Sequence, residues 1–168
     1  MSQDFYMGNP NLKKVGTEIQ FTQEQVKEYL KCKDDPVYFA RNYIKIISLD
    51  EGIVPFKMWD FQEELIESFH ENRFNIAKLP RQTGKSTTCV SYLLHYILFN
   101  DNVNVGILAN KLSTARDLLG RLQLAYEQLP MWLQQGIVVY NKGSMELENG
   151  SKILAASTSA SAVRGMSF

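Results

Sequence analysis

Residues 79–87 read Leu79-Pro80-Arg81-Gln82-Thr83-Gly84-Lys85-Ser86-Thr87, and this stretch decides the fold. Its second half matches the end of the phosphate-binding loop pattern G-x-x-x-x-G-K-[ST], although Leu79 stands where the first glycine belongs. The run from Phe74 to Leu79 predicts a short strand before the loop. Apolar residues from Ser86 to about Leu98 recur at helical spacing. The sequence therefore predicts a strand, a phosphate loop and a helix in succession.

The chemistry of such a loop assigns a role to several of its residues. Lys85 would reach the β- and γ-phosphates, and the Ser86 hydroxyl would bind Mg²⁺. Arg81 would touch the γ-phosphate during transfer, or else pair as an exposed side chain with a neighbouring acid. Arg81 and Lys85 are therefore the candidate catalytic residues. The residues expected to contact the nucleotide at the loop are Pro80, Arg81, Gln82, Thr83, Gly84, Lys85, Ser86 and Thr87.

An aromatic–glutamine pair, Phe61-Gln62, precedes the loop. A glutamine side chain donates and accepts at once, which suits the edge of adenine, and Phe61 would stack on the base. A surface glutamine beside a core phenylalanine is the alternative, and only the spacing to the loop favours a binding role. ATP with Mg²⁺ is the expected ligand.

Strand and helix patterns alternate after the loop. A strand is predicted from Val103 to Ala109 and a helix from about Ser113 to Leu129. Further strands are predicted at 137–140, 144–148 and 151–156. Asn149-Gly150 joins the last two and is a strong hairpin signal. This order predicts an α/β fold of the P-loop NTPase (RecA/helicase-like) class, with helices on a parallel sheet that is incomplete at the C-terminal end.

Helical patterns dominate the chain before the loop. Thr22 is a candidate N-cap for a helix over 23–30, and Pro36 suits the first turn of a second helix that ends near Tyr43. A third helix is predicted from Trp59 to about Phe69. We expect three parts: an arm or linker at 1–20, a helical N-terminal region at 21–58, and a partial P-loop ATPase core at 59–168.

Composition excludes several classes of protein. Lysine plus arginine equals aspartate plus glutamate, 18 against 18, whereas a dedicated DNA-binding domain is usually basic. No apolar run has the length of a membrane span, and the N-terminus lacks the features of a signal peptide, so we expect a cytosolic protein. The cysteines and histidines show no metal-ligand spacing, so we expect Cys89 to be a buried thiol and His70 and His95 to be structural.

Hydrolysis would also need an aspartate for Mg²⁺ at the end of an apolar strand, and a group that orients water. Asp50-Glu51 ends such a run, Ile44 to Leu49, but it precedes the loop, so we interpret it as a decoy. Residues 159–168 contain no acid. We therefore expect nucleotide binding, and essentially no hydrolysis, from this chain alone.

These motifs together closely resemble the large terminase subunit of T4-like tailed bacteriophages, the ATPase motor that packages double-stranded DNA. The resemblance covers almost the whole length. It is carried by Tyr6-Met7-Gly8, Pro10-Asn11-Leu12-Lys13, Asp35-Pro36-Val37-Tyr38-Phe39-Ala40, Phe61-Gln62, Arg81-Gln82-x-Gly84-Lys85, Val105-Gly106-Ile107-Leu108-Ala109, Leu129-Pro130, Trp132-Leu133-Gln134, Gly136-Ile137-Val138, Asn141-Lys142-Gly143-Ser144 and Ala162-Val163-Arg164-Gly165.

The resemblance implies a loop without the first glycine, an arginine acting in cis at Arg81, and adenine contact by Phe61-Gln62. It also implies double-stranded DNA, the portal protein and the small terminase subunit as partners. A homo-oligomeric ring in the host cytoplasm, docked on the procapsid portal, is implied as well. The family's Walker B acids, coupling motif and nuclease domain follow the segment that this sequence matches.

Two other functions stay open. A helicase-like P-loop ATPase shares an upstream glutamine and the strand–helix order, and a nuclease domain or a second RecA-like domain beyond Phe168 would separate the two ATPases. A nucleotide-binding or assembly module without hydrolysis is the third possibility, which a turnover assay would distinguish.

Overall fold

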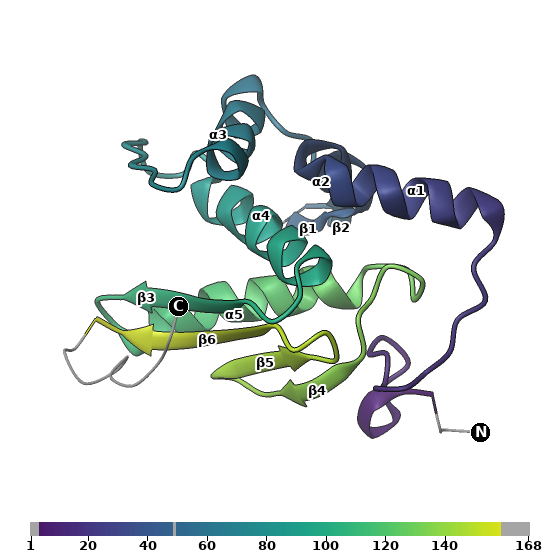
Figure 1. The fold of residues 1–168 in the computed structure, drawn as a ribbon. Helices are drawn as coiled ribbons and strands as arrows, with labels where there is room; N and C mark the ends of the chain where they lie inside the picture. Colours follow the sequence, from purple (N-terminus) through teal and green to yellow (C-terminus); the bar gives the residue numbers. More distant parts are fainter. Residues whose placement is uncertain (1–3, 49, 159–168) are drawn as a thin grey trace.

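The computed structural model describes residues 4–48 and 50–158, which form an α/β fold with five α-helices, one short 3-10 helix and six strands (Figure 1). The helices are η1 (Tyr6–Gly8), α1 (Gln23–Asp34), α2 (Pro36–Tyr43), α3 (Asp60–Glu71), α4 (Lys85–Phe99) and α5 (Leu112–Glu127). The strands are β1 (Lys45–Ser48), β2 (Gly52–Pro55), β3 (Asn104–Ala109), β4 (Ile137–Tyr140), β5 (Ser144–Leu147) and β6 (Lys152–Ser157). The Ala162-Val163-Arg164-Gly165 segment of the resemblance lies outside the described residues.

The predicted helix starts upstream of the loop are confirmed, and side chains at the helix ends explain them. At α1, the Gln25 N–H donates to the Thr22 hydroxyl at 3.1 Å, and the Thr22 N–H donates to the Gln25 side-chain oxygen at 3.0 Å. This reciprocal pair is a capping box. At α2, Asp35 accepts from the Tyr38 N–H at 2.9 Å, and Pro36 occupies the first turn.

The main sheet has four strands in the order β3-β6-β5-β4. The β5–β6 pair is antiparallel and joined at Asn149-Gly150, which confirms the predicted hairpin, and Gly150 has a φ of 79°. The expectation of a parallel sheet was wrong, because among the strands of the described residues only β3 and β6 pair in parallel, and the sheet is mixed. A short turn can join only antiparallel strands, whereas the β3–β6 pair needs the long connection through α5.

The predicted strand at 74–79 does not form: these residues pair with no strand in the described part of the chain. Phe74 is 82% exposed and Ile76 is 101% exposed. Alternating β-formers give a segment the tendency to extend, but a strand needs a neighbour that completes its hydrogen-bond ladder. The segment therefore reaches the loop as irregular chain.

The layers follow from which helices touch (Figure 1). Helix α5 packs on the sheet against β3 and β6, α4 packs on α5, and α2 and α3 pack on α4. Fully buried side chains of α4 and α5 form the centre of the core; they include Leu94, Ile97, Leu98, Leu119 and Leu122. This core holds α4, the helix that follows the loop, in a fixed position.

Strands β1 and β2 form a separate antiparallel hairpin with Lys45 opposite Pro55. Asp50 and Glu51 lie in its turn and are exposed, and their N–H groups donate to the Ser48 hydroxyl at 3.3 and 3.4 Å. The run that ends in Asp50-Glu51 is thus no strand of the main sheet.

The N-terminal residues are attached to the sheet side of the molecule through Gln134, which is 4% exposed. Its side-chain oxygen accepts from the Lys13 N–H at 3.0 Å, and its side-chain nitrogen lies 3.0 Å from the Asn11 carbonyl and 3.1 Å from that of Tyr126. The Ile137 N–H also donates to the Lys13 carbonyl at 2.8 Å. One buried amide therefore connects the N-terminal segment with the end of α5.

Replacing Gln134 with Leu should release this N-terminal segment. Leucine has a similar volume but leaves the Lys13 N–H and the Asn11 carbonyl without their partner, so we expect a loss of about 2 kcal/mol in unfolding free energy. Hydrogen exchange at Lys13 should accelerate together with the lower denaturation midpoint. Gln128→Leu, at the end of α5, is the matched control. Unchanged exchange at Lys13 would show that Gln134 does not hold the segment.

Candidate nucleotide-binding site

The loop from Pro80 to Gly84 turns the chain into α4. Gln82 and Gly84 adopt left-handed φ angles of 63° and 70°, on either side of Thr83. Glycine accepts this conformation freely, whereas a glutamine there costs roughly 1–2 kcal/mol. Left-handed residues in a turn occur in anion-binding nests, where successive backbone N–H groups point toward one concavity. The backbone of this loop is thus suited to an anion.

The N-terminus of α4 continues this concavity. Gly84 is the N-cap and has no side chain to accept from the first N–H groups, and the first turn carries no acidic residue. The positive end of the dipole of this 15-residue helix is therefore left uncompensated by the helix itself. Unpaired N–H groups together with such a dipole favour phosphate.

Lys85 and Thr83 both bond to one carbonyl of the loop. The Lys85 ammonium donates to the Pro80 carbonyl at 3.0 Å, and the Thr83 hydroxyl donates to the same oxygen at 3.1 Å. The lysine thus lies back across the loop. A phosphate would give the ammonium a charged acceptor in place of a neutral one, and such bonds are roughly twice as strong.

Gln62, at the start of α3, forms a hydrogen bond with the loop. Its side-chain nitrogen donates to the Thr83 carbonyl at 3.2 Å, and its oxygen accepts from the Trp59 N–H at 2.9 Å. The residue is 3% exposed. A Cβ on Gly84 would lie 2.5 Å from the Gln62 nitrogen, so this contact and the positive φ both require glycine at 84. Gln62 of the predicted Phe61-Gln62 pair is therefore in direct contact with the loop.

A cavity of about 440 Å³ opens beside this contact. Its lining combines Phe61 and Gln62 with Gln82, Thr83, Gly84 and Thr87 of the loop and α4. The other lining residues were missed by the sequence reasoning: Ile46, Phe56, Lys57 and Trp59. Three aromatic residues, Phe56, Trp59 and Phe61, are the signal in the sequence by which the segment 56–61 could have been found. Trp59 is 71% exposed, so its indole is available to a ligand.

Four predicted site residues are not part of the cavity lining: Pro80, Arg81, Lys85 and Ser86. Ser86 is half-buried in the first turn of α4, next to Lys85. Arg81 is exposed and is not part of the cavity lining, and no acid among the described residues pairs with it. Within residues 4–48 and 50–158, no group of three or more His, Cys, Asp or Glu side chains is placed to hold a metal.

Both histidines and both cysteines lie outside the loop. His95 is buried in α4 with its Nε2 2.8 Å from the Cys32 carbonyl, and burial lowers its pKa to about 4. Cys32 is fully buried, whereas Cys89 is only half-buried; both thiols are free, and burial raises the pKa of each. His95 and Cys32 thus belong to the packing between α1 and α4.

Comparison with models of known protein families gives no match for this sequence. None of the helices in the described residues is both long and apolar enough to cross a membrane. The function of this chain is therefore inferred from its sequence motifs and from the geometry of the loop and its cavity.

Proposed function

We propose that this chain binds ATP with Mg²⁺ through residues 80–87, as the nucleotide-binding part of a P-loop ATPase. The observation that carries the proposal is the hydrogen bond from Gln62 to the Thr83 carbonyl. It joins an anion-suited loop at a helix N-terminus to an aromatic-lined cavity of about 440 Å³. A nucleoside triphosphate combines the same two features, an anionic chain and a flat aromatic base.

The site residues then have distinct tasks. The triphosphate lies on the loop and on the N-terminus of α4, where Lys85 turns from the Pro80 carbonyl to the phosphates. Ser86 supplies a hydroxyl to Mg²⁺, which would neutralise phosphate charge when bound. The base enters the cavity between Trp59 and Phe61, and the second N–H of the Gln62 amide is the donor for its edge. Arg81, which is exposed, is the cation for the γ-phosphate.

We further propose that the chain serves a viral DNA-packaging motor of the large-terminase type. The order of motifs along the chain, from Tyr6-Met7-Gly8 to Asn141-Lys142-Gly143-Ser144, supports this class over the helicase-like and non-hydrolysing alternatives. Double-stranded DNA, the portal protein, the small terminase subunit and further copies in a ring are the partners of that proposal. Binding to an isolated portal ring is the expected result, and a preference for single-stranded nucleic acid would contradict it.

Tryptophan fluorescence offers a direct test of ATP binding. The chain has two tryptophans: Trp59 lines the cavity, and Trp132 packs against Tyr43 with ring centroids 5.6 Å apart. Titration with Mg-ATP should give a saturable change that survives Trp132→Phe and disappears in Trp59→Phe. A change that persists in Trp59→Phe, or no change with no heat of binding, would contradict the proposed site.

Gln62→Ala should reduce the preference for ATP over GTP. The substitution removes the donor to the base and also frees the Thr83 carbonyl, so affinity for both nucleotides should fall, and that for ATP more. Competition binding against wild-type protein measures the ratio. Gln25→Ala, at the start of α1, is the matched control. If the affinity for both nucleotides falls but the ratio of the ATP and GTP affinities is unchanged, Gln62 supports the loop and does not contact the base.

A further inference from the structure

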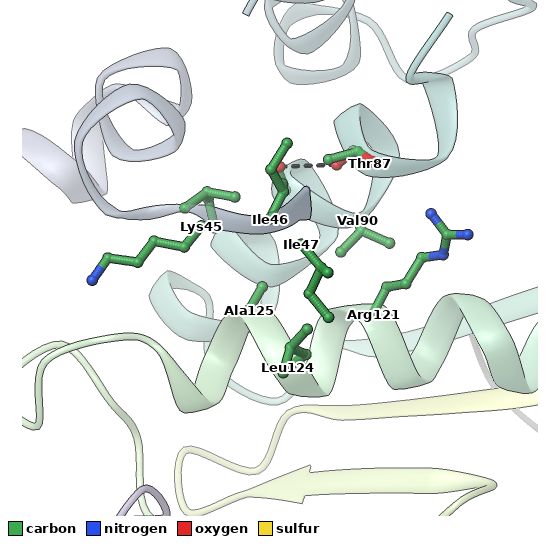
Figure 2. A pocket seen from close by; sticks show the side chains of 10 residues that line it. Lys45, Ile46, Ile47, Thr87, Val90, Arg121, Leu124 and Ala125 are labelled. Atoms are coloured by element: carbon green, nitrogen blue, oxygen red, sulfur yellow. Dashed lines mark hydrogen bonds between the residues drawn. The ribbon is translucent and has the colours of Figure 1, made fainter. Parts of the chain in front are cut away.

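A second cavity lies between the β1–β2 hairpin and the helices α4 and α5, with a volume of about 350 Å³ (Figure 2). Ligand sites in proteins begin at about 300 Å³. Aliphatic side chains from all three elements make up most of its wall; they include Ile46, Ile47, Val90, Leu124 and Ala125. The cavity is thus large enough for a small molecule and offers it apolar contacts.

The two isoleucines of β1 face opposite ways, as successive residues of a strand do. Ile47 points at Leu124 of α5, whereas Ile46 points toward Thr87 of α4 (Figure 2). Ile46 and Thr87 also line the candidate nucleotide cavity. The two cavities therefore share one wall, and Ile47 belongs to the second cavity alone.

One exposed cation, Arg121, lies at the edge of this space. Arg121 rises from α5 beside Val90 with its guanidinium at the outer side of the cavity, and the ammonium of Lys45 points away on the opposite side (Figure 2). No acidic side chain of the described residues forms an ion pair with Arg121. The Ser91 hydroxyl, also in the wall, already donates to the Thr87 carbonyl at 2.9 Å. Arg121 is therefore the group in the wall that would select a ligand by charge.

We propose that this cavity binds a small amphipathic anion. The apolar body of the ligand lies between Ile47, Val90 and Leu124, and its anionic head pairs with the Arg121 guanidinium. A cavity of this volume holds an unbranched chain of about ten non-hydrogen atoms. An alkyl carboxylate such as octanoate has this size and this distribution of charge.

The test is a titration of methyl-labelled protein, without nucleotide, followed by NMR. Octanoate below its micelle concentration is the probe, and octan-1-ol and acetate are compared with it. Octanoate should shift the methyl signals of Ile47, Val90 and Leu124 in a saturable manner. It should bind roughly fivefold more tightly than octan-1-ol, as expected for an exposed ion pair, and acetate should not bind.

Two variants, each with a matched control, test separately the contacts with the apolar body and with the anionic head of the ligand. Arg121→Gln should bring octanoate to the affinity of octan-1-ol, whereas Arg116→Gln on the same helix should not. Ile47→Ala should weaken both ligands, whereas Ile53→Ala should weaken neither: Ile53 is paired with Ile47 across the hairpin and does not line the cavity. Ile47 is 62% exposed, so the fold should tolerate its loss.

Absence of saturable binding, or binding that shifts methyl signals elsewhere and ignores Ile47→Ala, would overturn the proposal. If Arg121→Gln and Arg116→Gln prefer octanoate over octan-1-ol to the same extent, Arg121 does not bind the carboxylate head of the ligand. Since nucleotide is absent, neither result depends on whether the loop binds ATP.

Discussion

Lys85→Ala should lower the affinity for Mg-ATP by about a hundredfold, because the phosphates lose a charge-assisted hydrogen bond worth about 1.5–3 kcal/mol. The fold should be retained, since the ammonium of Lys85 bonds only to the Pro80 carbonyl. Calorimetric titration measures the affinity, and circular dichroism with a denaturation curve measures the fold. Lys142→Ala, in the turn between β4 and β5, is the matched control.

Lys85→Arg separates charge from geometry at the same position. A guanidinium keeps the charge, but it is planar and larger than an ammonium, so it cannot reproduce the approach of Lys85 to the loop. We expect binding weaker than wild type but stronger than in Lys85→Ala. Lys142→Ala should bind as wild type does; if Lys85→Ala does so too, the assignment of the phosphate loop is wrong.

The stability of the fold should decrease as the pH falls from 7 to 5, and His95 is the reason. His95 is buried against Phe39 and Phe99, with ring centroids 5.5 and 4.9 Å away, and burial lowers its pKa to about 4. The unfolded chain takes up a proton near pH 6.5, whereas the folded chain does not until about pH 4. The free energy of unfolding therefore decreases by about 3 kcal/mol as the pH falls from 7 to about 4, and about 2 kcal/mol of this decrease is reached by pH 5.

Urea denaturation at a series of pH values measures this decrease. The pKa values of Glu28 and Glu148 are lowered by hydrogen bonds to their carboxylates, so the stability that these groups contribute is lost only at still lower pH. His95→Phe should flatten the curve between pH 7 and 5, whereas the exposed His70→Asn should not. A decrease that is equally steep in His95→Phe would assign it to other groups.

Short-range signals were sufficient for the local elements. Thr22 and Pro36 mark the starts of α1 and α2, and Asn149-Gly150 marks the β5–β6 turn, because each acts through atoms of its own few residues. The loop and the start of α4 follow for the same reason, since the left-handed φ of Gly84 is a local property. Local periodicity failed at 74–79, where strand formation depends on a neighbouring strand.

The sequence by itself determined the helices, the hairpin, the loop and the residue types available at the loop. Only the tertiary structure decided that the sheet is mixed, that Gln134 binds the N-terminal segment, and that Gln62 supports Thr83. It also decided that Trp59 and Lys57 share a cavity with Gly84, and that Arg121 and Ile47 of a distant hairpin line the same cavity. These features join residues far apart along the chain, and they depend on how α3, α4 and α5 pack, which periodicity does not encode.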